Sequence, residues 1–123
     1  MNGQELVERA EAASAQAYAP YSKYLVGATL LLKDGSLVDG VNVENAAYPL
    51  GVCAERTAIA KAASEGSRPG DIEAIGITAS PCGGCRQWLY EFRIEEVTFR
   101  NTAGELVTYS AAELLPDTWD LPA

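Results

Sequence analysis

All three cysteines of this 123-residue chain lie in two short segments, and the sequence contains no histidine. The segments are Cys53-Ala54-Glu55-Arg56 and Pro81-Cys82-Gly83-Gly84-Cys85. A soft metal ion in a tetrahedral site takes about four ligands, and three thiolates supply only three of them. If the thiols bind one ion, the fold must bring both segments to one point. The fourth position is then open to a water molecule beside a glutamate, which is typical of a hydrolytic centre.

The spacing within each segment predicts where these residues lie on helices. Cys53 and Glu55 are two positions apart, so on the flank of a helix they would point to nearly opposite sides. They can approach one ion only from the first turn. Cys82 and Cys85 are three positions apart and share a face in such a turn. We therefore expect two helix N-termini directed at one ion, with Arg56 donating hydrogen bonds to the thiolate sulfurs.

The absence of histidine limits the catalytic mechanisms and the metal ligands that this chain can use. It excludes Ser-His-Asp and Cys-His nucleophilic sites and any metal site with imidazole ligands. Glu55, next to a candidate ligand, is the best-placed group to carry a proton. Two other interpretations stay open at this point. Cys82 and Cys85 also fit a thioredoxin-like redox pair, and the three cysteines also fit a structural zinc site.

Composition favours a globular protein that acts on a small molecule. The length predicts one domain over residues 1–123, and 48 % hydrophobic residues are enough for a buried core. A net charge of −8 without a basic cluster argues against nucleic acid as a partner. No apolar run approaches the ~20 residues of a membrane span, and the first residues do not resemble a secretory signal. An odd number of cysteines without an export signal predicts a cytoplasmic location.

Apolar periodicity and turn residues predict the order α-β-β-α-β-α-β-β-α. A capping box at Asn2 and Glu5 starts a helix whose apolar repeat continues to Ala17. A hairpin turns at Asp34-Gly35, where the pair is expected to supply positive φ angles. The expected strands cover 25–32, 37–43, 72–79, 96–100 and 106–109, and the other helices cover 53–64, 83–92 and a short stretch after Ser110. This order predicts an α/β fold with three α/β/α layers around a mixed five-stranded sheet.

Several separate blocks resemble the small zinc-dependent cytidine deaminases with a three-cysteine site, within the cytidine and deoxycytidylate deaminase superfamily. The resemblance covers nearly the whole chain and rests on Tyr18-Ala19-Pro20-Tyr21-Ser22-Lys23-Tyr24, Val26-Gly27-Ala28, Asn42-Val43-Glu44-Asn45-Ala46-Ala47-Tyr48-Pro49, Cys53-Ala54-Glu55-Arg56-Thr57-Ala58-Ile59, Pro81-Cys82-Gly83-Gly84-Cys85-Arg86-Gln87 and Leu114-Leu115-Pro116.

This resemblance implies hydrolytic deamination of free cytidine or deoxycytidine in pyrimidine salvage, with release of ammonia. It implies one Zn²⁺ per chain on Cys53, Cys82 and Cys85, with zinc-bound hydroxide attacking C4 of the pyrimidine. Glu55 would take the proton of the water, deliver it to ring N3 and later protonate the departing amine. Within the same class, a related nucleoside-analogue or aminopyrimidine deaminase is the alternative.

The resemblance also implies how the substrate is bound. Asn42 and Glu44 would bind the ribose 3′-hydroxyl, because an amide with a carboxylate offers the donor and acceptor that a hydroxyl needs. The backbone of Ala54 would bind the base carbonyl. Tyr24 and Trp119 stand where relatives carry phenylalanines that stack on the base.

The family pattern further implies a homotetramer in which neighbouring subunits complete each site. Tyr48 matches a tyrosine expected to cross a subunit boundary. The chain departs from the pattern in four places: Tyr24 adds a hydroxyl, Leu25 replaces a proline, Trp119 is larger than phenylalanine, and the connection over 77–81 is shorter than in many relatives. The shorter connection leaves open what lines the leaving-group side and which subunit contacts form there.

Overall fold

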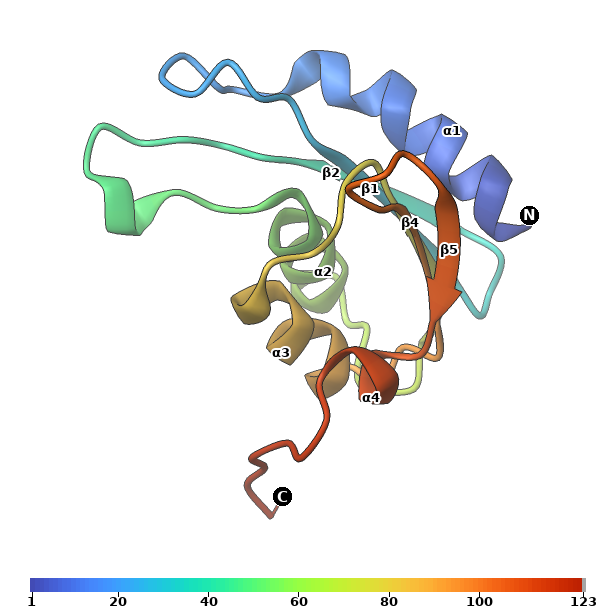
Figure 1. Cartoon of the computed structure of the whole chain (residues 1–123). Coiled ribbons are helices and arrows are strands. Elements are labelled where there is room, and N and C mark those ends of the chain that lie inside the picture. The colour runs from blue at the N-terminus through green and yellow to red at the C-terminus, as the bar shows by residue number, and fades with distance from the viewer. Residues whose placement is uncertain (123) are drawn as a thin grey trace.

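The computed structural model describes residues 1–122 and contains one mixed five-stranded sheet (Figure 1). The strand order is β2-β1-β3-β4-β5; β3 and β4 are parallel, and the other neighbouring pairs are antiparallel. The strands are β1 (Gly27–Leu32), β2 (Leu37–Val41), β3 (Ile72–Ile77), β4 (Glu96–Arg100) and β5 (Leu106–Tyr109). The helices are α1 (Gly3–Ala13), α2 (Ala54–Ser64), α3 (Gly83–Glu91) and α4 (Ala111–Leu114), with the 3-10 helices η1 (Ser14–Gln16) and η2 (Tyr48–Leu50).

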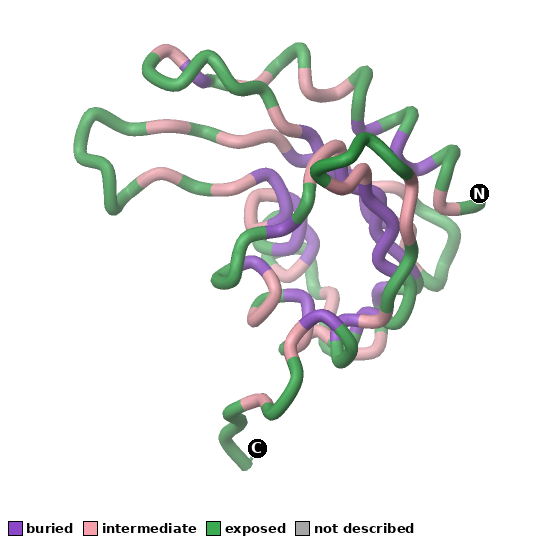
Figure 2. Tube along the Cα trace, viewed as in Figure 1, coloured by how far each residue is buried: buried purple, intermediate pink, exposed green. Residues whose placement is uncertain are grey.

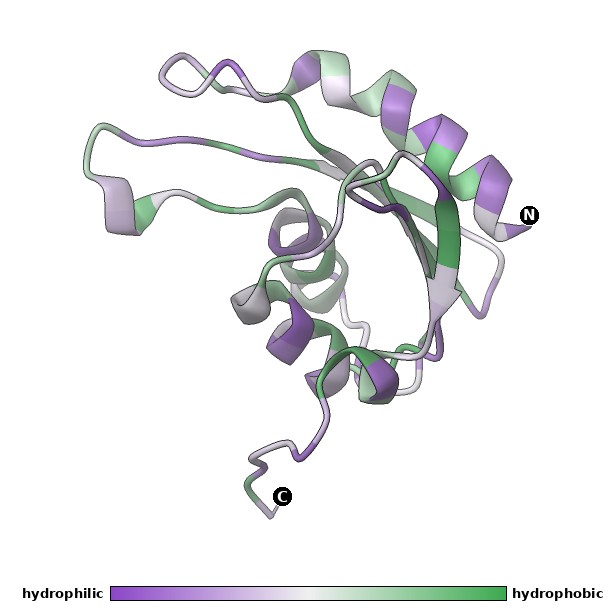
Figure 3. Ribbon diagram, in the orientation of Figure 1, coloured by the Kyte–Doolittle hydropathy of each residue, from purple (hydrophilic) through white to green (hydrophobic). Residues whose placement is uncertain are grey.

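Helices cover both faces of this sheet. α1 packs against β1, β3 and β4 on one face, whereas α2 packs against β1 and β2 on the other, with α3 beside α2 and α4 (Figure 1). Burial concentrates on the strands and on the helix sides that face them (Figure 2), and hydrophobic residues occupy much of this interior (Figure 3). The fully buried side chains include Leu6, Leu30, Ile59, Ile75 and Leu89. The three-layer α/β/α prediction is therefore confirmed. No helix within residues 1–122 has the length and apolar character needed to cross a membrane.

The first helix is shorter than its apolar repeat predicts. α1 ends at Ala13, and the chain leaves it through η1 instead of remaining helical to Ala17. The reason is a long-range pairing of Tyr18, whose N–H donates to the carbonyl of Asn42 at 3.0 Å and whose carbonyl accepts the N–H of Glu44 at 2.8 Å. This extended pairing cannot form from a helical backbone, so the local helical signal is overridden.

The hairpin forms where predicted, but its strands are shorter at their open ends. The Oδ1 atom of Asn42 accepts the N–H of Val26 at 2.8 Å, so at this end of the hairpin the Val26 N–H bonds to a side chain and not to the backbone of the neighbouring strand. β3 likewise ends at Ile77, before the predicted boundary. In the turn, Gly35 has a φ of 91°, whereas Asp34 does not adopt a positive φ. Only the glycine of the expected pair supplies that angle.

Gly40 sets the distance between β2 and the start of α2. A Cβ atom built on Gly40 would lie 2.6 Å from the carbonyl oxygen of Ala54 and 2.5 Å from the nitrogen of Ala58, closer than real atoms pack. Glycine therefore lets the first turns of α2 rest directly on the sheet. This contact positions the N-terminus of α2, which carries the first of the two cysteine segments.

Two long loops run side by side and extend from the body of the protein (Figure 1). They cover residues 18–25 and 43–52, and we call them together the arm. Isolated bridges join Tyr18 to Val43 and Val43 to Val52. Most residues of the arm are exposed (Figure 2).

Candidate metal centre and substrate cleft

The three cysteines lie together, as expected for ligands of one ion. Their sulfur atoms are all within 4.8 Å of one another, and the Sγ atoms of Cys53 and Cys82 are 4.0 Å apart. Cys53 is the N-cap of α2, Cys82 is the N-cap of α3, and Cys85 lies in the first turn of α3. Two helix N-termini therefore meet at the sulfur cluster, where their partial positive charges stabilise thiolates.

This donor set fits one zinc ion per chain. Thiolate sulfur is a preferred zinc ligand, and three protein ligands with one open position are typical of catalytic zinc sites. The Sγ atom of Cys82 accepts the N–H of Cys85 at 3.4 Å and Nη2 of Arg56 at 3.8 Å. Arg56 thus lies beside the thiols, as expected. Its Nε atom is buried without a hydrogen-bond partner among residues 1–122, so the guanidinium keeps a free donor next to the cluster.

The thiols differ in acidity because their surroundings differ. Partial burial raises the pKa of Cys82, but hydrogen bonds from the Cys85 N–H, the neighbouring thiols and Arg56 outweigh it and bring this pKa below its usual value. Burial raises the pKa of Cys85 far above its usual value, and the negative charge of Glu55 adds to the effect.

The position of Cys53 distinguishes a metal site from a redox site. A redox pair formed by Cys82 and Cys85 would not require Cys53 nearby. Because the three sulfurs converge, the geometry favours a metal site over a redox pair.

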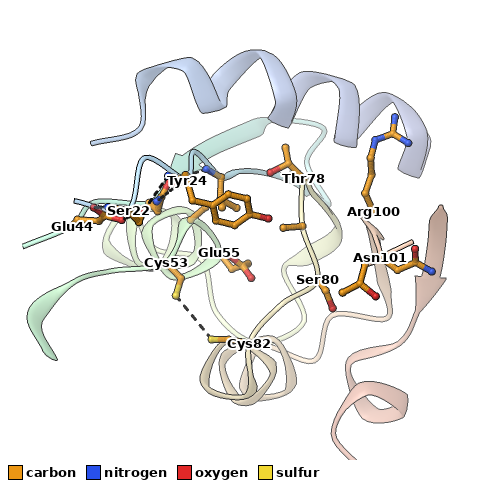
Figure 4. Close-up of a pocket in the computed structure, with 15 residues that line it drawn as sticks. Ser22, Tyr24, Glu44, Cys53, Glu55, Thr78, Ser80, Cys82, Arg100 and Asn101 are labelled. Carbon is orange, nitrogen blue, oxygen red and sulfur yellow. Dashed lines mark hydrogen bonds between the residues drawn. The ribbon is translucent and has the colours of Figure 1, made fainter. Parts of the chain in front are cut away.

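Glu55 lies in the first turn of α2 and is only 4 % exposed. Burial raises the pKa of its carboxyl above the usual value, against hydrogen bonds from its own N–H and the Cys85 thiol and the charge of Arg56. The carboxyl lies in the cleft that Cys53 and Tyr24 also line (Figure 4). A buried carboxyl with a raised pKa can both accept and release a proton near neutral pH.

A cleft of about 440 Å³ opens beside Glu55 and the cysteine cluster. Its volume lies within the ~300–1,000 Å³ range of small-molecule sites. One end of the cleft is lined by Ser22, Tyr24, Asn42 and Glu44, and the centre by Cys53, Ala54, Glu55 and Cys82 (Figure 4). The predicted sugar-binding pair and the predicted acid–base group therefore share one cleft with two of the predicted metal ligands, Cys53 and Cys82.

Asn42 and Glu44 line the cleft and also hold the adjacent loop. Oδ1 of Asn42 accepts the N–H of Val26, and Nδ2 donates to the carbonyl of Tyr24, both at 2.8 Å. Glu44 accepts three hydrogen bonds from residues 21–22. Each side chain keeps unused capacity: one N–H and one lone pair on the amide, and one lone pair on the carboxylate.

The three aromatic residues expected around the substrate are placed differently. Tyr24 lines the cleft and is 62 % exposed. Tyr48 lies in η2 at the end of the arm, is 85 % exposed and does not line the cleft. Trp119 follows α4, is 70 % exposed and does not line it either. One chain alone therefore brings Tyr24 to the site, but neither Tyr48 nor Trp119.

The residues at the far end of the cleft are not among those expected from the sequence. This end is lined by Thr78 and Ser80, which follow β3, and by residues 101–102, which follow β4. β3 and β4 are the parallel pair, and ligand sites in α/β proteins lie at the carboxyl ends of parallel strands. Polar residues directly after these two strands are the signal that could have identified it. Arg100 borders this end, but its guanidinium turns towards α1 and pairs with Glu11 at 3.5 Å (Figure 4).

Known proteins match this chain in sequence and in fold. The family model for the cytidine and deoxycytidylate deaminase zinc-binding region matches residues 1–101. The cytidine deaminase of Halalkalibacterium halodurans is 45 % identical to this chain, over 94 % of this chain and 92 % of the relative. The cytidine deaminase of Sporosarcina psychrophila is 42 % identical, over 94 % of this chain and 90 % of the relative. The crystal structure of cytidine deaminase from Burkholderia pseudomallei matches with a TM-score of 0.89 at 43 % identity, covering 97 % of this chain and 100 % of the other. The chain therefore belongs to the cytidine and deoxycytidylate deaminase family.

Proposed function

We propose that this protein hydrolyses free cytidine and deoxycytidine to uridine and deoxyuridine with release of ammonia, using one zinc ion per chain. The observation that carries the proposal is the buried carboxyl of Glu55 beside three convergent thiols in a cleft of small-molecule size. Membership of the family and the high identity to proteins named cytidine deaminase support it.

Cys53, Cys82 and Cys85 are proposed to hold the zinc ion, which when bound lowers the pKa of a water molecule towards about 7. Glu55 takes up one proton of the attacking water and delivers it to ring N3 as the new C4–O bond forms. It then takes the remaining proton from the new C4 hydroxyl and gives it to the amine, so that the C4–N bond breaks, ammonia leaves and the C4 carbonyl forms. A group with this double task needs a pKa near neutrality, and the burial of Glu55 raises its pKa in that direction.

The N–H of Ala54 is proposed to bind the carbonyl oxygen of the base. Among the described residues, the side chain of the N-cap residue Cys53 does not cap the first turn of α2, and the N–H of Ala54 has no side-chain acceptor. Ala54 lines the cleft directly beside Glu55. A free donor at a helix N-terminus is suited to a carbonyl oxygen.

The sugar is proposed to lie at the Asn42 and Glu44 end of the cleft. The free N–H of Asn42 can donate to the 3′-hydroxyl, and the remaining lone pair of Glu44 can accept from it. Tyr24 stacks on the base from the same end. This arrangement favours a nucleoside over a free base, because cytosine would leave both polar groups without a partner.

We further propose a homotetramer in which neighbouring copies complete each site. The arm exposes several large hydrophobic side chains, as a subunit interface does. These residues are Tyr18, Tyr21, Tyr24, Leu25, Tyr48 and Leu50. Tyr48 would then reach the cleft of a neighbour, and Trp119 would stack on a base bound in the assembly. Residues 1–123 are proposed to act as one deaminase domain in pyrimidine salvage in the cytoplasm.

The decisive experiment combines zinc analysis with an assay on cytidine, deoxycytidine, cytosine, adenosine and a cytidine-containing oligonucleotide. We expect one zinc per chain, conversion of the two cytosine nucleosides only, loss of activity with a chelator and recovery with zinc. Failure of the zinc-loaded protein to deaminate either nucleoside would overturn the proposal. Equal rates on cytosine and cytidine would instead indicate an aminopyrimidine deaminase.

A further inference from the structure

Ser22 connects two groups at the proposed sugar end of the cleft. The Ser22 hydroxyl donates a hydrogen bond to Oε2 of Glu44. The oxygen of the same hydroxyl, Oγ of Ser22, accepts the N–H of Tyr24 at 3.0 Å. Through these two hydrogen bonds, the Ser22 hydroxyl links the backbone N–H of Tyr24 to the carboxylate of Glu44. Ser22 itself lines the cleft beside both residues (Figure 4).

The other oxygen of Glu44 is held separately. Oε1 accepts the N–H of Tyr21 at 3.0 Å and the N–H of Ser22 at 3.1 Å. An ionised carboxylate offers about four acceptor sites, so three are occupied and one remains on Oε2. The Ser22 hydroxyl shares Oε2 with this vacant site, and it therefore determines the direction in which Glu44 can accept another hydroxyl.

We propose that Ser22 is a positioning residue for recognition of the sugar 3′-hydroxyl, acting through Glu44. The inference rests on the proposed function, because it takes Glu44 as the group that binds the sugar. Ser22 makes no hydrogen bond of its own to the sugar; it fixes the carboxylate oxygen that does. Through the N–H of Tyr24 it also fixes the loop that carries the aromatic ring over the base.

The charge state of Glu44 agrees with this role. Hydrogen bonds from the Ser22 hydroxyl and N–H lower the pKa of the Glu44 carboxyl. The carboxylate therefore stays ionised and acts only as an acceptor at neutral pH. An acceptor of this kind distinguishes a substrate that has a hydroxyl from one that lacks it, because without the hydroxyl one acceptor site of the carboxylate faces the bound substrate without a partner.

The test compares kcat/KM for cytidine with kcat/KM for 3′-deoxycytidine in the zinc-loaded enzyme. In Ser22→Ala we expect the ratio of kcat/KM for cytidine to kcat/KM for 3′-deoxycytidine to fall about tenfold, through a higher KM for cytidine. The reason is that the hydrogen bond from the sugar 3′-hydroxyl to the charged Glu44 carboxylate is misaligned. Ser22→Thr keeps the hydroxyl and should restore the ratio. Ser36→Ala is the matched control: it removes a serine hydroxyl that donates to Asp34 at 2.6 Å in the hairpin turn, away from the cleft.

A double-mutant cycle with Glu44→Gln gives a second measure. If Ser22 acts through Glu44, the ratio in the double variant should be no lower than in Glu44→Gln alone. An unchanged ratio in Ser22→Ala overturns the inference, even if both rates fall together, since a purely structural role would lower both equally. Additive losses in the cycle overturn it as well. A wild-type protein without cytidine deaminase activity would refute the proposed function itself, before any variant is compared.

Discussion

The Nη2 atom of Arg56 lies 3.8 Å from Sγ of Cys82, in space that a side chain at Gly84 would occupy. A Cβ atom built on Gly84 would lie 2.3 Å from this Nη2, whereas one built on Gly83 would meet no atom within 4 Å. The two glycines of the second cysteine segment therefore have different roles. Gly84 leaves room for the arginine that donates to the sulfur of Cys82, a proposed zinc ligand.

Gly84→Ala should weaken the site without removing any ligand. The new methyl group must displace the guanidinium from Cys82, and loss of such a supporting hydrogen bond typically costs about 10–100-fold in metal affinity or activity. We expect about a tenfold loss of kcat and faster release of zinc to a chelator. Gly83→Ala is the matched control and should behave as wild type. Equal behaviour of the two variants would show that the Arg56 contact does not support the metal.

Glu55→Gln should separate catalysis from metal binding. Glutamine keeps the shape of the side chain but cannot carry the proton, and a positioned acid–base group contributes roughly 10²–10⁴ in rate. We expect one zinc per chain and a loss of kcat of at least this order, measured by the absorbance change of cytidine. Glu65→Gln, at the opposite end of α2, provides a control for the charge change. A Glu55→Gln enzyme within about tenfold of wild type would remove Glu55 from the mechanism.

Removal of zinc should expose the thiols in a defined order. Cys82 is exposed and its pKa lies below the usual value, so its reactive thiolate forms at lower pH than that of the buried Cys85, whose pKa is raised. We expect iodoacetamide to modify Cys82 first and Cys85 last in the stripped protein, as followed by peptide mass spectrometry. All three cysteines should be protected in the zinc-loaded protein. Rapid modification of Cys82 and Cys85 with zinc present would indicate a redox pair instead.

Features that depend on neighbouring positions could be predicted from the sequence. The capping box at Asn2 forms as expected, because a cap and its partner lie three residues apart. The convergence of Cys53, Cys82 and Cys85 also follows from local spacing, since one ion and two helix starts leave few arrangements. Family resemblance then supplied roles that spacing alone does not determine.

Features that depend on distant packing could not be predicted in this way. The link from Ser22 to Glu44 joins positions 22 residues apart, and it exists because Tyr18 pairs with residues 42 and 44. The same pairing shortens α1 against a strong helical repeat. The far end of the cleft requires knowing that β3 and β4 are parallel neighbours. In the proposed homotetramer, the positions of Tyr48 and Trp119 in a complete site depend on other copies of the chain.

Subunit mixing tests whether Tyr48 acts on the cleft of a neighbour. Tyr48 is 85 % exposed and does not line the cleft of its own chain, so Tyr48→Ala should lower activity only if the residue acts across an interface. A mixed assembly of Tyr48→Ala and Glu55→Gln chains contains sites that combine an intact Glu55 with a neighbour's intact Tyr48. If each site takes its tyrosine from one neighbour, about a quarter of the sites in a random mixture are complete. We therefore expect co-expressed chains to regain about that fraction of wild-type activity, although each variant alone is impaired.

Co-expression of Glu55→Gln with Gly84→Ala is the control and should give no such gain. Glu55 and Gly84 belong to the metal centre of the same chain, so neither kind of chain contains an intact centre. Activity that stays at the average of the two separate variants would place the effect of Tyr48 within its own subunit.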